Sequence, residues 1–264
     1  MLVRTLPLTE PLAITAVPLT RDAFAPFGDA IANPRPEARP SNTAPETIAR
    51  GQLPCGAVSA NQGTAIQYRA IASMRDLYGS APSRQPGTPR MTMFVCGART
   101  LVSRRDGGEP DAEADAVRVA VLERHPFTSQ TFVPLTADAA KRYLVIVAPT
   151  LDPAGDDHGL PAPDGAGLPG RGLPDVRRLR AFVATGEQAV TYGAGTWHAP
   201  MVALGPPDST VDFVVVQFAN DVPVEDCQEV ALEDGGGEGE GEGEGPAKIW
   251  VQVLERDGRE TARL

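Results

Sequence analysis

Short apolar runs, each bounded by proline, glycine or other turn-forming residues, recur along most of this chain. Its 264 residues include 26 prolines and 27 glycines, which leave little room for helices of several turns. Apolar residues make up 42% of the chain, enough for a hydrophobic core. Runs at this spacing are typical of antiparallel sheets, and no strand–helix–strand alternation is visible. The sequence therefore predicts a mainly β protein with few short helices.

The expected strands differ in their apolar pattern. The strand expected at residues 116–122 has apolar side chains at its odd positions 117, 119 and 121, as a strand with one solvated face does. Residues 143–148 and 213–218 are apolar on both faces, which is typical of strands buried on both sides. The remaining strands are expected at residues 14–19, 65–70, 91–96, 131–135, 179–183, 189–192, 201–204 and 248–254. One short helix is expected after Thr20 as N-cap, with Asp22 in its first turn and Gly28 at its end.

We expect a single domain over residues 1–264 with loops between its strands. Residues 33–54 are rich in proline and predict a loop, and residues 150–175 predict a loop insert that carries a solvated His158. The Gly/Glu-rich tract at residues 234–246 is expected to be disordered, because it has no apolar side chains to bury.

Charge and composition limit the partners. The formal net charge of −10 argues against nucleic acid, because phosphate binding needs clustered cations. No stretch approaches the roughly twenty apolar residues of a membrane span, and residues 1–20 do not resemble a signal peptide. The sequence Ala262-Arg263-Leu264 resembles the Ser-Lys-Leu peroxisomal address. The expected location is therefore cytoplasmic or peroxisomal.

The first group of chemistry-bearing residues lies between two expected strands. Glu123 and His125 fall on one face of the chain because side chains alternate along a strand, and Gln130 lies on the returning strand. This spacing resembles the His-x-His-x4-Glu element of the cupin superfamily, which supplies three ligands to a metal. Glutamate, imidazole and an amide oxygen can hold a divalent ion such as nickel or manganese. The alternative is a polar hairpin in which Glu123 pairs with Arg124 or His125.

The second group is centred on His198. Gly195-x-x-His198 resembles the second cupin element, whose histidine is the fourth ligand. Gly193 and Gly195 permit a tight turn before this histidine. The neighbouring Trp197 is either a binding residue or a plug of the barrel. The resemblance implies a cupin-like antiparallel β-barrel or double-stranded sandwich, with Glu123, His125, Gln130 and His198 as the metal set.

Longer segments resemble one family. The sequence Leu122-Glu-Arg-His-Pro126 with Gln130, and later Leu179-Arg-Ala-Phe182, Tyr192 and Trp197-His198-x-Pro200, are similar to signatures of the ureidoglycolate lyase family. Together with weaker matches they run in the family's order from residue 14 to about residue 230. The resemblance implies a carbon–nitrogen lyase that cleaves (S)-ureidoglycolate to glyoxylate and urea in allantoin and purine breakdown. It also implies a homodimer and a divalent metal, with no organic cofactor.

This reaction needs a base near the substrate hydroxyl, an acid near the leaving nitrogen and a cation for the carboxylate. His198, Glu123, His125 and Tyr192 are the catalytic candidates, and Arg124, Gln130 and Trp197 are the substrate-binding candidates. Without a metal, His198 becomes the base and Glu123 or His125 the acid. Two other functions remain open: another cupin-type metal-dependent enzyme, such as an isomerase or dioxygenase, or a non-catalytic barrel that binds a small ligand.

Overall fold

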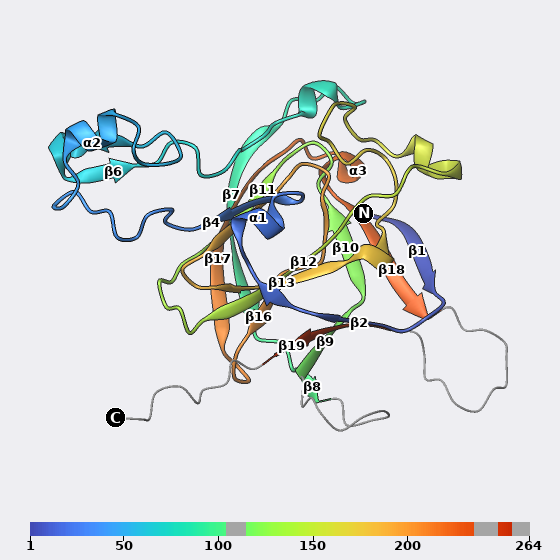
Figure 1. The fold of residues 1–264 in the computed structure, drawn as a ribbon. Coiled ribbons are helices and arrows are strands. Elements are labelled where there is room, and N and C mark those ends of the chain that lie inside the picture. Colours follow the sequence, from blue (N-terminus) through green and yellow to red (C-terminus); the bar gives the residue numbers. More distant parts are fainter. Residues whose placement is uncertain (104–114, 235–247, 255–264) are drawn as a thin grey trace.

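The computed structural model describes residues 1–103, 115–234 and 248–254 (Figure 1). Nearly all of the Gly/Glu-rich tract and the sequence Ala262-Arg263-Leu264 lie outside the described residues, so the predictions made for them stay predictions. In the part of the chain that is described, no helix is long and apolar enough to cross a membrane.

The mainly β fold is confirmed, because strands account for most of the regular structure and the helices are short. The helices are α1 (Arg21–Phe24), α2 (Pro45–Ala49) and α3 (Pro223–Asp226). The strands are β1 (Leu2–Leu8), β2 (Leu12–Thr15), β3 (Val17–Pro18), β4 (Gly28–Ile31), β5 (Val58–Ala60), β6 (Ala65–Gln67), β7 (Thr88–Gly97), β8 (Val102–Ser103), β9 (Asp115–Val119), β10 (Val121–Arg124), β11 (Gln130–Pro134), β12 (Arg142–Ala148), β13 (Arg180–Thr185), β14 (Ala189–Tyr192), β15 (Trp197–His198), β16 (Val202–Leu204), β17 (Thr210–Ala219), β18 (Gln228–Asp234) and β19 (Ile249–Val253).

The strands form four sheets: three packed together in the body, and a two-stranded sheet of β5 and β6 in the projecting segment. The central eight-stranded sheet has the order β1-β18-β10-β15-β12-β13-β3, with β16 also paired to β12. A five-stranded sheet, β4-β14-β11-β17-β7, covers one of its faces, and a four-stranded sheet, β2-β19-β9-β8, covers the other. Most pairs are antiparallel, whereas β1–β18, β3–β13 and β2–β19 are parallel. Among the described residues no sheet closes into a barrel, so the fold is the sandwich form of the prediction.

The central strand β12 explains this layering. Tyr143, Val145 and Val147 point into the core shared with the five-stranded sheet. Leu144, Ile146 and Ala148 point into the core shared with the four-stranded sheet. Because successive side chains of a strand point to opposite faces, one unbroken apolar run serves two cores. The prediction of burial on both faces is thus confirmed for this strand.

Other local predictions are corrected. Thr20 caps α1 by accepting a hydrogen bond from the Ala23 amide, as expected, but the helix ends at Phe24 and Gly28 instead begins β4. Gly28 has φ +146°, and a Cβ there would overlap the Thr191 carbonyl oxygen of β14.

The expected loop at residues 33–54 contains α2, with a proline at the start of the helix. Strand β17 buries only one face fully, because its other face lies outside the two cores.

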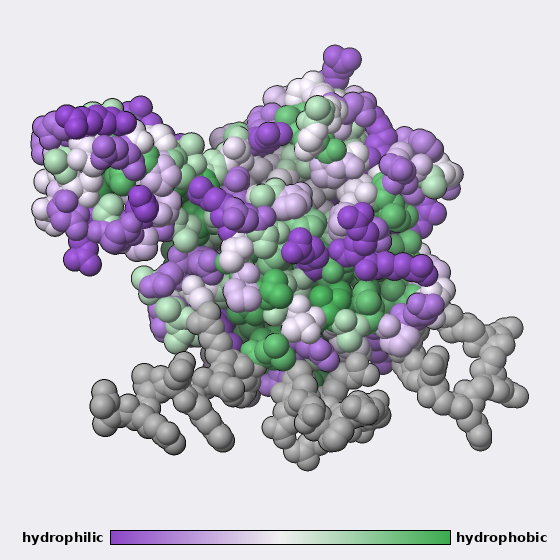
Figure 2. All heavy atoms as spheres, in the orientation of Figure 1, coloured by the Kyte–Doolittle hydropathy of each residue, from purple (hydrophilic) through white to green (hydrophobic). Residues whose placement is uncertain are grey.

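Two excursions leave the sandwich. The segment that carries α2, β5 and β6 projects to one side of the body in Figure 1, and Figure 2 shows a mainly hydrophilic surface over it. Residues 150–175 lie between β12 and β13. This insert carries an exposed His158, as predicted, and contacts the body through Arg124 and Trp197.

Candidate active site

Two strands of the central sheet bring the first two candidate residues together. Glu123 of β10 is directly opposite His198 of β15 in the antiparallel register. The Glu123 carboxylate oxygen Oε1 lies 3.6 Å from His198 Nε2. His125 follows the end of β10, and its ring centroid is 5.5 Å from that of His198. One ligand atom from each of the three residues lies within 4.8 Å of the others.

The five-stranded sheet contributes Gln130 and Tyr192, which are paired across its strands β11 and β14. Phe132, two residues after Gln130, lies in the core between the two sheets, so Gln130 faces the central sheet as well. The Tyr192 ring stacks on the His198 ring, with centroids 4.0 Å apart and planes 13° apart. The four predicted metal residues, Glu123, His125, Gln130 and His198, are called the histidine cluster below.

Backbone carbonyls fix the orientation of both imidazoles. His125 Nδ1 is 2.7 Å from the Asp226 carbonyl oxygen, and His198 Nδ1 is 2.9 Å from the Thr196 carbonyl oxygen. A carbonyl can only accept, so each Nδ1 donates, and in the neutral form of each ring the lone pair lies on Nε2. Both Nε2 atoms are buried, and neither has a hydrogen-bond partner in the described part of the chain. This is how second-sphere contacts prepare histidines to bind a metal.

The side-chain amide of Gln130 is also held in one orientation by a neighbouring residue. Its Nε2 donates to Gln217 Oε1 at 2.7 Å, while its own Oε1 is buried and has no partner. Leaving a buried acceptor unpaired costs free energy, so such atoms need an explanation. His125, His198 and Glu123 each offer one ligand atom within 4.8 Å of the others, and Gln130 faces the central sheet from β11. That donor set suits nickel, manganese or another divalent transition metal.

Burial sets the charge states of these groups. It lowers the pKa of His125, and the neighbouring His198 lowers it further. Burial alone would raise the pKa of Glu123, but the imidazoles of His198 and His125 outweigh it and lower the pKa. Burial raises the pKa of Tyr192 well above its ordinary value. The site therefore combines an ionised carboxylate, a neutral His125 and a protonated phenol whose hydroxyl has no partner.

Two predicted substrate-binding residues point away from the histidine cluster. Arg124 and Trp197 each neighbour a cluster residue in a strand, so alternation turns them to the opposite face. The Arg124 guanidinium is fully buried. It lies 4.5 Å from the centroid of the Trp197 ring and donates to the carbonyls of Gly170, Arg171 and Gly172 and to Gln228. Trp197 is fully buried and donates to the Gly172 carbonyl. Their contacts argue against substrate binding by either residue, because both anchor the insert to the core.

Sequence reasoning missed three residues that support the site. Gln217 orients Gln130, the Asp226 carbonyl orients His125, and Cys227 Sγ lies 4.0 Å from Glu123 Oε2. Burial, with a contribution from Glu123, raises the pKa of Cys227 to about 12, so it remains a thiol. In the sequence, Gln217 stood out as the single polar residue in the apolar run at residues 213–218, and Asp226-Cys227 was one of the weaker family matches.

Comparison of the sequence with known proteins identifies the family of this chain. The family model described as "Ureidoglycolate lyase" matches residues 11–236. A ureidoglycolate lyase of Schizosaccharomyces pombe is 33% identical over 226 residues, covering 85% of this chain and 94% of its own. One of Saccharomyces cerevisiae is 31% identical over 229 residues, covering 85% and 96%. One of Burkholderia mallei (strain NCTC 10229) is 34% identical over 204 residues, covering 77% and 81%. The chain belongs to the ureidoglycolate lyase family.

Proposed function

We propose that this protein is a lyase that cleaves ureidoglycolate to glyoxylate and urea, a step of allantoin breakdown. Family membership supports the reaction. The observation that carries the site is the set of buried lone pairs without partners, on His125, His198 and Gln130, beside an ionised Glu123.

The histidine cluster fits a divalent metal ion. His125 and His198 would offer their Nε2 atoms, Gln130 its Oε1, and Glu123 a carboxylate oxygen. Nickel and manganese both accept this mixture of nitrogen and oxygen ligands. When bound, such an ion supplies a Lewis acid that lowers the pKa of a hydroxyl and attracts a carboxylate.

Glu123 is suited to move the proton of the reaction. In ureidoglycolate one carbon bears a hydroxyl, a carboxylate and a urea nitrogen. As the carbon–nitrogen bond breaks, the hydroxyl loses its proton, the carbon–oxygen bond becomes the aldehyde, and the nitrogen gains a proton. Glu123 Oε1 faces His198, whereas Oε2 lies on the side of Cys227. We assign Oε2 to accept the hydroxyl proton and return it to the nitrogen, which restores the starting charge state.

Tyr192 would act as a fixed hydrogen-bond donor. Its stacking on His198 and its raised pKa keep the hydroxyl protonated and in place. A donor that is held in a water-poor site stabilises developing negative charge without reorganising. We assign this donor to the leaving urea group. If the cluster works without a metal, His198 becomes the base and Glu123 or His125 the acid.

A direct assay tests the proposal. Purified protein is mixed with each enantiomer of ureidoglycolate, and glyoxylate, urea and ammonia are measured before and after chelation, with metal analysis of the same sample. We expect equal amounts of glyoxylate and urea in the absence of oxygen. Release of ammonia, a need for oxygen, or binding without turnover would each contradict the proposal and favour another cupin-type enzyme or a ligand-binding protein.

We further propose that the protein forms a homodimer through β7, the outer strand of the five-stranded sheet. Met91, Met93 and Val95 are 74%, 60% and 64% exposed on one face of this strand. A long apolar edge strand is a ready site for pairing with another chain. Met91→Glu combined with Met93→Glu should halve the mass measured by light scattering, whereas Leu151→Glu, which changes an exposed leucine in the insert, should not. An unchanged mass in the double variant would exclude this interface.

A further inference from the structure

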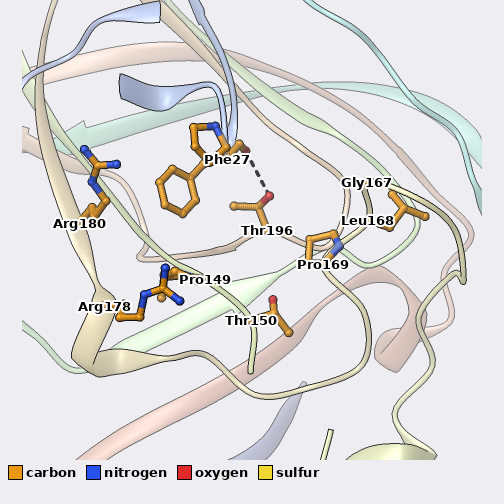
Figure 3. A pocket seen from close by; sticks show the side chains of 11 residues that line it. Phe27, Pro149, Thr150, Gly167, Leu168, Pro169, Arg178, Arg180 and Thr196 are labelled. Carbon is orange, nitrogen blue, oxygen red and sulfur yellow. Dashed lines mark hydrogen bonds between the residues drawn. The ribbon is translucent and has the colours of Figure 1, made fainter. Parts of the chain in front are cut away.

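A pocket lies outside the histidine cluster. Figure 3 shows it between the corner after α1, the end of β12, the insert and the start of β13. Its volume is about 420 Å³. None of the residues that line it belongs to the histidine cluster, so a ligand here would not occupy the proposed catalytic position.

Two arginines give this pocket its charge. Arg178 and Arg180 both line it, while Leu179 between them is buried in the core. No acidic residue is among the lining residues. Within the described residues, no hydrogen bond or ion pair engages either guanidinium, and the Arg180 Cζ lies 5.3 Å from the centroid of the Phe182 ring. In a chain with a net charge of −10, two adjacent cations without a carboxylate partner create a local site for an anion.

The remaining walls are largely apolar. Phe27, Pro149, Leu168 and Pro169 surround the space in Figure 3, with the Arg178 guanidinium and the Thr150 hydroxyl directed toward it. The Thr150 hydroxyl has no hydrogen-bond partner in the described structure. Guanidinium groups form strong, often bidentate hydrogen bonds with the oxygens of a carboxylate or a phosphate. Apolar walls add affinity for the hydrocarbon part of a ligand.

From these contacts we infer that the pocket binds a small organic anion, with its carboxylate or phosphate on Arg178 and Arg180 and its apolar part against Phe27, Leu168 and Pro169. A purely inorganic anion would leave the apolar walls unused. A neutral molecule of the same shape would leave the two guanidinium groups without a partner.

The pocket also shares a wall with the histidine cluster. Thr196 lines the pocket, and its backbone carbonyl accepts the hydrogen bond from His198 Nδ1. The Thr196 hydroxyl donates to the Phe27 carbonyl at 3.1 Å, and so does the Gly193 amide at 2.9 Å. One short turn therefore joins a wall of the pocket to the acceptor that orients His198. An anion held against this turn is expected to change turnover and to leave substrate binding nearly unchanged.

Calorimetric titration of the full chain tests the binding. The probes are phenyl phosphate and benzoate as organic anions, inorganic phosphate as an anion without an organic body, and benzamide as a neutral analogue of benzoate. We expect phenyl phosphate and benzoate to bind at least tenfold more tightly than inorganic phosphate and benzamide respectively. Equal affinity within either pair would overturn the inference, because it would remove the need for the apolar walls or for the arginines.

A matched pair of variants locates the site. Arg178→Gln combined with Arg180→Gln should weaken phenyl phosphate binding at least tenfold. Arg177→Gln changes a neighbouring exposed arginine that does not line the pocket, and should alter the affinity less than twofold. All three arginines are exposed, so we expect folded proteins, checked by circular dichroism. Equal binding by the double variant and by Arg177→Gln would place the anion elsewhere.

The kinetic consequence rests on the proposed lyase function. Saturating phenyl phosphate should change kcat at least twofold with little change in KM, and the double variant should lose this response. A rise in KM alone would show competition at the catalytic site and overturn the coupling. If the protein does not cleave ureidoglycolate, the calorimetric result still decides the binding, so the two failures are distinguishable.

Discussion

Two buried polar clusters lie next to each other in this protein, and they differ in how completely their atoms are paired. In the first, Glu225 accepts from the Ser83 amide at 2.8 Å, from the Ser83 hydroxyl at 2.6 Å and from Asn220 Nδ2 at 2.7 Å. The neighbouring Asp226 accepts from the Tyr78 hydroxyl and from the amides of Asn220 and Asp221. In the histidine cluster, by contrast, His125, His198 and Gln130 each keep an unpaired acceptor.

The difference separates a structural cluster from a functional one. A buried carboxylate whose acceptors are filled by the protein itself contributes to the fold and has little capacity left for a ligand. Buried lone pairs without partners reduce the stability of the fold and are free for a ligand. The two clusters meet at Asp226, whose side chain belongs to the first and whose carbonyl orients His125 in the second. The following predictions test this division.

The largest effect is expected for His198→Ala. Its Nε2 has no hydrogen-bond partner among the described residues, so kcat should fall by about a thousandfold or more, roughly 4 kcal/mol in activation free energy. The variant also loses the Nδ1 contact with the Thr196 carbonyl and the stack on Tyr192, so it should be folded but less stable. Steady-state assays with thermal denaturation measure both quantities. His158→Ala, at an exposed histidine of the insert, serves as the control and should keep full activity. Near-normal turnover in His198→Ala would contradict the assigned site.

Glu225→Ala should have the opposite effect to His198→Ala: it should lower the stability of the protein and leave kcat nearly unchanged. The change removes the carboxylate that accepts from the Ser83 amide and hydroxyl and that is the shortest acceptor of the buried Asn220 Nδ2, which typically costs about 1–3 kcal/mol of unfolding free energy. The kcat of the remaining folded protein should stay within twofold of wild type. Urea denaturation and assays below the denaturation midpoint give the two values. A large loss of kcat without a loss of stability would end the distinction between the clusters.

A smaller effect is expected where one residue only positions another. Gln217→Leu removes the acceptor that holds Gln130 Nε2, so the affinity for nickel or manganese should fall about 10–100-fold. Gln217→Glu keeps an acceptor oxygen at this position and should retain most of the affinity. Calorimetric titration of metal into chelator-treated protein measures it. If both variants lose affinity equally, the role of Gln217 is packing and not orientation.

The smallest effect is a pH dependence of stability. Burial alone would raise the pKa of Glu225, but hydrogen bonds from Ser83 and Asn220 outweigh it and hold the pKa below its ordinary value. The carboxylate therefore contributes stability that is fully present above the unfolded pKa, about 4.3, and is lost as the pH falls through the folded value. Wild type should lose stability over this window more steeply than Glu225→Gln. Parallel curves for the two proteins would mean that other carboxylates cause the acid unfolding.

Alternation along strands made part of the site predictable. Glu123 and His125 share a face because they are two residues apart, and the glycine turn before His198 lets β15 return beside β10. The same rule, applied to their neighbours, would have placed Arg124 and Trp197 on the opposite face. Family signatures drew attention to these two residues, but the signatures do not separate a buried anchor from a residue that faces the substrate.

Features that depend on distant contacts were not predictable from the sequence. Strands β1 and β18 were missed because their side chains mix apolar and charged residues, and they pair in parallel across more than 200 positions. The three-sheet arrangement also depends on which strands meet, and no local pattern specifies this. The pocket lined by Arg178 and Arg180 needs the insert and β13 to lie together. In the sequence Arg180 was therefore only part of a family signature, and Arg178 had no assigned role.

Strand β12, with one core on each side, has a consequence for how this sequence can vary. An ordinary surface strand accepts polar substitutions at every second position, so its tolerance follows a two-residue rhythm. From Tyr143 to Ala148 every side chain is buried, and a truncation at any of the larger ones leaves a cavity in one core or the other. A scan of all substitutions should therefore show this strand as an unbroken intolerant block, whereas β9, with exposed Arg118 between Val117 and Val119, should retain a tolerant position in its middle.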